Sequence, residues 1–164
     1  MKKFIISIDA GTTSNRSILF DLKGKPVFSS QKEFTQYFPK NGWVEHDPEE
    51  IWRSTVKTLK EVIKKANKLK GKVLSIGITN QRETTVLWDK KTGKTVYRAI
   101  VWQDRRTEEY CKKLRKQNKD TTIFNKTGLL IDPYFSGTKI KWILDNVPIA
   151  RQLENKKQLL FGTI

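Results

Sequence analysis

The sequence near the amino terminus contains the segment Ile5-Ile6-Ser7-Ile8-Asp9-Ala10-Gly11-Thr12-Thr13-Ser14-Asn15-Arg16. An apolar, β-prone run over 4–8 ends just before an aspartate, and a second such run follows at 16–20. A third occupies 26–30, after a turn rich in polar residues and glycine. Short β-prone runs separated by turn residues predict strands, so the chain is expected to open with three strands.

A long helix is predicted to begin at Asp47-Pro48-Glu49-Glu50. Aspartate is a favoured N-cap residue, proline suits the first helical position, and acids stabilise the positive end of the helix dipole. Asp47 and Glu50 also have the spacing of a capping box. Apolar and threonine residues then recur at three- and four-residue steps, which predicts a helix face toward a core. These residues are Ile51, Trp52, Thr55, Val56, Leu59, Val62, Ile63 and Ala66.

Further elements are predicted as strands over 73–78, 84–88 and 96–102 and helices over 107–116 and 136–144. The segment 34–46 is interpreted as a surface loop with room for one strand, and Trp43 in it is expected to cover another group. Strands joined by turns, followed by helices, favour an α/β fold with a mixed sheet and flanking helices. The length of 164 residues predicts one compact unit.

Composition excludes some classes of protein and leaves one alternative open. No stretch approaches the ~20 apolar residues of a membrane span. The net charge of +16 raises nucleic acid or an anionic membrane surface as a partner, although the lysines are spread over the chain and no zinc-ligand set or ribonucleoprotein signature accompanies them. A solvated helix face explains the lysine-rich stretches 57–72 and 112–119 more simply. The single cysteine, Cys111, is expected to have no reactive role, and the single histidine, His46, is expected to have a structural or surface role.

The segment from Asp9 to Arg16 has the parts of a phosphate-binding turn. Glycine allows close approach of the backbone to an anion, and Thr12, Thr13 and Ser14 supply hydroxyl donors. Arg16 adds positive charge, and the Asp9 carboxylate could serve a magnesium ion. An acid beside phosphate donors is what phosphoryl transfer requires. A plain hairpin turn would also accommodate these residues.

Two other groups of residues suit a small polyol. Arg82 and Glu83 follow an apolar strand, and a guanidinium that donates beside a carboxylate that accepts could hold neighbouring hydroxyls. Trp102, in 102–106, and Tyr134, in 132–139, could form walls of a pocket. Exposed surface charges and ordinary core packing explain the same residues equally well when each group is taken alone.

Taken together, five segments in order resemble the FGGY family of carbohydrate kinases, and the glycerol kinases within it. They are 8–14 (Ile-Asp-Ala-Gly-Thr-Thr-Ser), 42–48, 76–85, 100–107 and 131–139. The segment Asn80-Gln81-Arg82-Glu83-Thr84 points to glycerol over other sugars and polyols of the family. Ala10 departs from the glutamine that glycerol kinases usually carry at this position.

The resemblance implies an actin-like, ribonuclease-H-like fold and ATP-dependent phosphorylation of glycerol to sn-glycerol 3-phosphate. Arg82, Glu83, Tyr134 and Trp102 would contact glycerol. Thr12, Thr13, Ser14 and Arg16 would contact nucleotide phosphates, and Asp9 would serve Mg²⁺. The two groups are expected to line one cavity. The complete enzyme is expected to be cytoplasmic and a homo-oligomer, with glycerol and ATP as partners and no specific nucleic acid.

The resemblance also implies that residues 1–164 are most of the first lobe of a two-lobe kinase, with the carboxy-terminal lobe absent. The family's general base is an aspartate in a Gly-Asp-Gln-Gln segment, and this sequence contains no such segment. No catalytic residue is therefore assigned here, and the chain alone is expected to be inactive. A basic nucleic-acid-binding module and a non-catalytic glycerol-binding remnant remain the alternatives.

Overall fold

The computed structural model describes all residues, Met1–Ile164, and the chain forms two compact units. Unit 1 comprises Met1–Gln36 and Asp47–Gln81, and unit 2 comprises Tyr37–His46 and Arg82–Ile164. The prediction of one compact unit from chain length was therefore wrong. Two separate sheets explain the division, because each sheet builds its own hydrophobic cluster.

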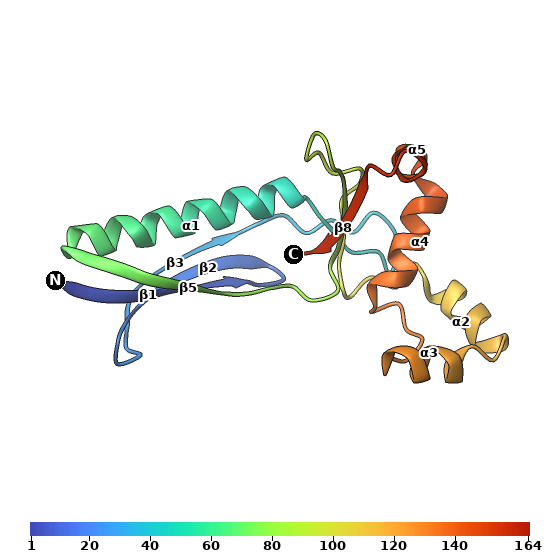
Figure 1. The fold of residues 1–164 in the computed structure, drawn as a ribbon, viewed down its shortest axis with the longest axis horizontal. Helices are drawn as coiled ribbons and strands as arrows, with labels where there is room; N and C mark the ends of the chain where they lie inside the picture. The colour runs from blue at the N-terminus through green and yellow to red at the C-terminus, as the bar shows by residue number, and fades with distance from the viewer. The chain divides into compact units, whose positions relative to one another are not determined.

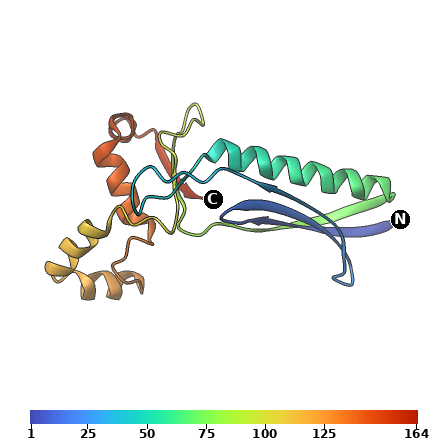
Figure 2. The same cartoon turned by 180° about the vertical axis from the view of Figure 1, so that it is seen from behind.

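Unit 1 is a four-stranded sheet covered by one long helix (Figures 1 and 2). Its strands are β1 (Lys2–Ala10), β2 (Ser14–Asp21), β3 (Pro26–Glu33) and β5 (Gly71–Thr79), in the order β3-β2-β1-β5. β1 pairs antiparallel with β2 and parallel with β5, so the predicted mixed sheet is confirmed. The parallel pair needs a crossover, and helix α1 (Pro48–Lys68) provides it.

Helix α1 begins as the sequence predicts but without a complete capping box. The Asp47 carboxylate accepts a hydrogen bond from the Glu49 amide at 2.9 Å, and Pro48 is the first helical residue. Glu50 does not reach back to the cap. Its carboxylate accepts hydrogen bonds from the backbone amide and hydroxyl of Thr35, each at 3.2 Å, and so ties the end of β3 to the helix.

The buried face of α1 is rotated from the predicted one. Ile51, Val62 and Ala66 are buried as expected, whereas Trp52 is 65% exposed and Ile63 is 37% exposed. Polar partners on the sheet explain the rotation. Asn15 Nδ2 on β2 donates to Ser54 Oγ at 2.6 Å, and the Ser17 and Thr58 hydroxyls lie 2.9 Å apart. Buried polar groups on β2 must find hydrogen-bond partners, and the helix turns its hydroxyl residues toward them.

Unit 2 contains a second sheet, with the strands β4 (Glu45–His46), β7 (Ala99–Ile100), β6 (Thr85–Asp89) and β8 (Leu159–Thr163), in the order β4-β7-β6-β8. Helices α2 (Glu108–Lys116), α3 (Asp120–Thr127), α4 (Ser136–Asn146) and α5 (Pro148–Asn155) complete it (Figure 1). Leu87, Ile100, Ile143 and Ala150 form its buried apolar cluster. Sheet and helices therefore share one core.

Several boundaries in unit 2 differ from the prediction. The strand expected over 96–102 contains only the two residues of β7, because Val101 and the residues after it enter a turn fixed by Asp104. Helices α3 and α5 were not predicted. Gly128, which ends α3 with a φ of 72°, and Pro148 at the first position of α5 were available signals.

A buried arginine connects the parts of unit 2 that are distant in sequence. The Arg106 side chain is fully buried and donates to both carboxylate oxygens of Asp104 at 2.9 Å and to Glu45 Oε1 at 2.8 Å. Its guanidinium carbon lies 3.8 Å from the centre of the Trp43 ring and 4.5 Å from that of Trp142. Trp43 therefore covers another group, as predicted, and that group is a cation.

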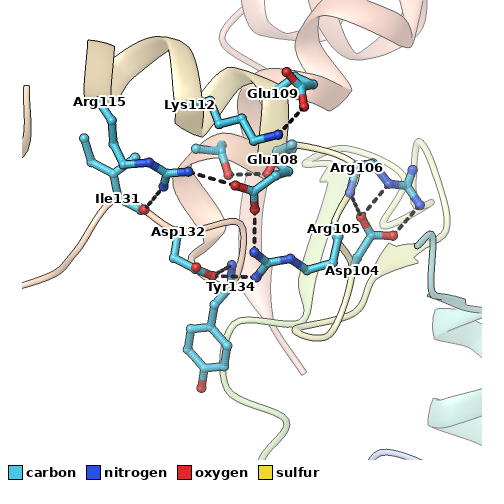
Figure 3. Close-up of polar contacts among 12 residues, drawn as sticks. Asp104, Arg105, Arg106, Glu108, Glu109, Lys112, Arg115, Ile131, Asp132 and Tyr134 are labelled. Atoms are coloured by element: carbon cyan, nitrogen blue, oxygen red, sulfur yellow. Dashed lines mark hydrogen bonds and ion pairs between the residues drawn. The ribbon is translucent and has the colours of Figure 1, made fainter. Parts of the chain in front are cut away.

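The neighbouring arginine has a different environment (Figure 3). Arg105 is half exposed and pairs with Glu108 and, at 3.0 Å, with Asp132. Burial lowers the pKa of the Arg106 guanidinium, but hydrogen bonds and charges from Asp104 and Glu45 outweigh burial and leave the pKa raised. Arg106 is thus buried against aromatic rings, whereas Arg105, the residue before it, lies at the surface.

Replacement of Arg106 by alanine is expected to lower the free energy of unfolding of unit 2 by about 3–5 kcal/mol, because two buried carboxylates would lose their counter-ion. Arg106→Lys should recover little of this loss, since an ammonium cannot make the bidentate contact. Urea unfolding followed by tryptophan fluorescence measures the change. Arg105→Ala is the matched control and should cost about 1 kcal/mol or less. Equal losses for Arg105→Ala and Arg106→Ala would contradict the assignment.

Candidate functional site

The predicted phosphate-binding turn joins β1 to β2 in unit 1, and its backbone is held by other parts of that unit. The Gly11 amide donates to the Ser14 carbonyl at 3.0 Å, and a Cβ at Gly11 would stand 2.9 Å from that same oxygen. Only glycine therefore fits this turn. The Gly11 carbonyl accepts from Gln81 Nε2 at 2.8 Å and the Thr12 carbonyl from Gln36 Nε2 at 3.1 Å.

These contacts fix the shape of a short turn whose outer residues are polar. Thr13 is exposed and Thr12 and Ser14 are half-buried, and Ser14 Oγ accepts a hydrogen bond from Gln31 at 2.9 Å. Gln81, which lies beside Arg82 in the sequence, is a buried residue of unit 1 that supports the turn. Hydroxyl groups on a turn that is fixed in this way suit an anion such as phosphate.

Asp9 and Arg16 face each other on the paired strands β1 and β2. Arg16 donates to Asp9 Oδ2 at 3.2 Å, and both side chains are partly exposed. No cluster of three or more potential metal-binding side chains exists in the structure. A magnesium ion needs only one or two protein carboxylates when waters and substrate phosphates complete its shell, so the lone Asp9 carboxylate fits such an ion.

All four residues predicted to contact glycerol belong to unit 2. Arg82 is exposed, and its side chain makes no hydrogen bond or ion pair. Glu83 is half-buried, and its Oε2 accepts from the Ser136 amide at 2.7 Å and from the Ser136 hydroxyl at 2.6 Å. Ser136 is the first residue of α4, where the helix dipole favours a carboxylate. Glu83 Oε1 makes no protein hydrogen bond and can accept one from a ligand.

The backbone of Glu83 has a left-handed conformation with a φ of 64°. This conformation is unfavourable for a residue with a side chain and persists where the surroundings enforce it. Here the Glu83 carbonyl accepts from Lys139 Nζ at 2.7 Å and from Thr85 Oγ1 at 3.2 Å. Both the carbonyl and the carboxylate of Glu83 are therefore fixed.

Trp102 and Tyr134 also lie together. Their ring centres are 5.9 Å apart in an edge-to-face arrangement, and Tyr134 stacks in the same manner on Phe135 at 5.1 Å. The Tyr134 backbone is fixed as well, since its amide donates to Asp132 Oδ1 at 2.8 Å (Figure 3). The structure thus groups Trp102 with Tyr134, and links Tyr134 to Glu83 through one further residue, Lys139.

Sequence reasoning missed Lys139. Its side chain is completely buried, and its Nζ donates to the Tyr134 carbonyl at 2.6 Å as well as to the Glu83 carbonyl. Burial lowers the pKa of Lys139 to about 8, although the charges of Glu83, Asp104 and Asp132 oppose this shift. The available signal was position: Ile143, four residues later on α4, faces the core, so Lys139 shares the buried helix face.

The single cysteine and the single histidine are both buried. Cys111 is buried, and burial raises the pKa of its thiol, which disfavours the reactive thiolate. His46 is buried in β4. None of the helices combines the length and the apolar character that crossing a membrane would require.

The stability of the chain is expected to depend on the ionisation of Lys139. Because the native pKa is lowered from 10.5 to about 8, the unfolded state binds more protons than the native state between these values. The cost of burying the ammonium is fully present below pH ~8 and disappears as pH rises toward ~10.5. The free energy of unfolding of the wild type should therefore increase, relative to that of Lys139→Met, as the pH rises from 7 to 10. A difference that does not change with pH in urea unfolding would contradict this.

Comparison with known proteins places the chain in a family. The model of the FGGY family of carbohydrate kinases, N-terminal domain, matches residues 4–163. The glycerol kinase of Oceanobacillus iheyensis is 60% identical over 99% of the chain and 33% of its own length. That of Malacoplasma penetrans is 60% identical over 99% of the chain and 32% of its length. The chain thus spans about a third of these curated relatives.

Among solved structures, glycerol kinase from Plasmodium falciparum with ADP matches with a TM-score of 0.92 and 38% identity, over 99% of the chain and 32% of that protein. This match confirms the predicted actin-like α/β fold. The family model covers nearly every residue, including the turn at Gly11 and the residues around Glu83. The chain belongs to the FGGY family of carbohydrate kinases, of which it carries the N-terminal domain.

Proposed function

We propose that this chain supplies the glycerol-binding and phosphate-binding residues of an ATP-dependent glycerol kinase. A terminal glycerol hydroxyl would attack the γ-phosphorus of ATP, forming the new O–P bond as the bond from the γ-phosphorus to ADP breaks. The hydroxyl proton passes to a base, and the products are sn-glycerol 3-phosphate and ADP. The similarity to glycerol kinases at 60% identity supports this substrate and this nucleotide.

The arrangement of Arg82 and Glu83 carries the proposal. Glu83 presents one fixed carboxylate oxygen without a protein partner, and the adjacent Arg82 presents a guanidinium without one. Neighbouring hydroxyls of a polyol would accept from Arg82 and donate to Glu83, with Trp102 and Tyr134 against the carbon chain. A carboxylate that is already fixed loses little entropy when it binds a ligand.

The turn after β1 would bind the nucleotide phosphates through Thr12, Thr13, Ser14 and Arg16. Asp9 would hold Mg²⁺, directly or through water, and the ion would neutralise charge on the phosphates. Arg16, now paired with Asp9, would exchange that carboxylate for a phosphate oxygen. Phosphoryl transfer requires both groups of residues to act on one pair of reactants, and it depends mainly on positioning and charge.

The catalytic base would come from residues outside this sequence, which contains no Gly-Asp-Gln-Gln segment. A second lobe would likewise supply the adenosine pocket, in a cytoplasmic enzyme that we expect to be a homo-oligomer. The comparisons give no support to the alternative of a nucleic-acid-binding module or of a remnant without chemistry. The lysines of α1 instead lie mostly on its exposed face, as a solvated helix would place them.

Glycerol binding should depend on Arg82 and Glu83. Hydrogen bonds to charged groups contribute about 1.5–3 kcal/mol, so Arg82→Ala and Glu83→Gln should each weaken binding roughly 10- to 100-fold. Titration of the 164-residue chain with glycerol, followed by calorimetry or by amide chemical shifts, measures the dissociation constant.

Lys94→Ala is the matched control for loss of one exposed positive charge in unit 2, because Lys94 is also exposed and without an ion pair. Its glycerol affinity should equal that of the wild type. If Arg82→Ala binds glycerol as tightly as Lys94→Ala does, Arg82 has no place in the site.

The chain by itself should show no glycerol-dependent formation of ADP, because we propose that the base and the adenosine pocket come from residues outside this sequence. A coupled assay for ADP, with and without glycerol, tests this on protein purified free of other kinases. A sustained rate that requires both glycerol and ATP, and that Glu83→Gln abolishes, would show that the catalytic groups lie within these residues.

A further inference from the structure

Lys139 is a buried charged residue of unit 2, and its hydrogen bonds lie within the candidate site. Its side chain is completely buried, and its ammonium donates to the backbone carbonyls of two of the proposed glycerol-binding residues. One carbonyl belongs to Glu83 and the other to Tyr134, which are 51 residues apart in sequence.

We infer that Lys139 is a positioning residue for glycerol: it fixes the Glu83 carboxylate and the Tyr134 ring relative to each other by binding the backbone carbonyls of both residues. This inference rests on the proposed function, since it assigns glycerol contacts to Glu83 and Tyr134. It adds a residue that itself touches no substrate.

The cost of burying Lys139 argues for such a role. Removing an ammonium from water costs several kcal/mol, and replacement of buried charged groups by apolar ones of similar volume is often neutral or stabilising. Met or Leu would fill the space at lower cost but would donate no hydrogen bond to Glu83. The left-handed backbone of Glu83, at a φ of 64°, would then rest on Thr85 alone.

Ionisation does not remove the contact. A protonated lysine has three N–H donors and a neutral amine retains two, which is the number of carbonyls that Lys139 binds. Glu83, Asp104, Asp132 and Arg106 are the charged groups that act on it. The bridge between Glu83 and Tyr134 can therefore persist on both sides of its titration, and a variant must remove the donors to break it.

The test compares Lys139→Met with two control variants on the same helix in the 164-residue chain. Lys141→Met removes a lysine that is exposed and paired with Asp145 at 2.6 Å. Ile143→Ala lowers stability by creating a cavity in the buried cluster, without touching the carbonyl contacts. Three quantities are measured: the free energy of unfolding, the dissociation constant for glycerol, and hydrogen exchange of the Ser136 amide, which donates to Glu83.

We expect Lys139→Met to weaken glycerol binding tenfold or more and to accelerate exchange of the Ser136 amide beyond what any change in its global stability explains. Lys141→Met should match the wild type. Ile143→Ala should lose stability while keeping its glycerol affinity within about twofold, a change equivalent to ~0.4 kcal/mol. Wild-type values of affinity and exchange in Lys139→Met, or equal losses of affinity in Lys139→Met and Ile143→Ala, would overturn the inference.

Two further outcomes are also decisive. If Lys139→Met does not fold, Lys139→Leu takes its place, because leucine also removes every N–H donor to the two carbonyls. Glycerol affinity in Lys139→Leu that equals the wild-type value would then overturn the inference. If the wild type itself does not bind glycerol, the proposed function fails for this chain, whereas Ser136 exchange in Lys139→Met still decides whether Lys139 fixes Glu83.

Discussion

The enclosed Arg106 guanidinium is the interaction on which the architecture of unit 2 depends. It packs against the Trp43 and Trp142 rings, which contact each other edge to face, and it binds the carboxylates of Asp104 and Glu45. Those partners come from the 37–46 segment, from the turn after β7 and from α4. A planar cation with a rigid fork of donors can satisfy stacked rings and two carboxylates at once, and no other side chain can. The two carboxylates and the one guanidinium together carry a net negative charge. Arg98, which is partly exposed, balances this charge, and its Nη1 lies 3.8 Å from Glu45 Oε2.

The sequence predicted most elements of unit 1 because local signals and tertiary structure agree there. The run over 4–8, the turn at Gly11 and the cap at Asp47 each reflect local constraints that the structure retains. The buried face of α1 could not be predicted in the same manner. Its direction depends on Asn15 and Ser17, whose side chains point inward from β2 against the usual apolar pattern. Hydrophobic periodicity takes no account of a polar interface between helix and sheet.

In the candidate site, the sequence predicted residues that would touch a ligand but gave no role to Lys139, which binds the backbone of two of them. Glu83 and Tyr134 were predicted from motifs, and the structure connects them through Lys139. A lysine within a basic chain of net charge +16 is interpreted as solvated unless its helix face is known. The likewise unexpected left-handed backbone at Glu83 has no sequence signal, since glycine and asparagine are the usual residues there.

The division of the chain also affects how it folds during synthesis. The ten residues 37–46 belong to unit 2 although unit 1 flanks them on both sides in the sequence. When β4 leaves the ribosome, its partner β7 and Arg106 have yet to be translated, a delay of roughly 3–12 s for about 60 residues at typical rates. In the nascent chain, Trp43 and the carboxylate of Glu45 must therefore remain exposed to solvent until Arg106 has been translated. A chaperone that binds exposed aromatic segments would find this stretch available during that interval and hidden afterwards.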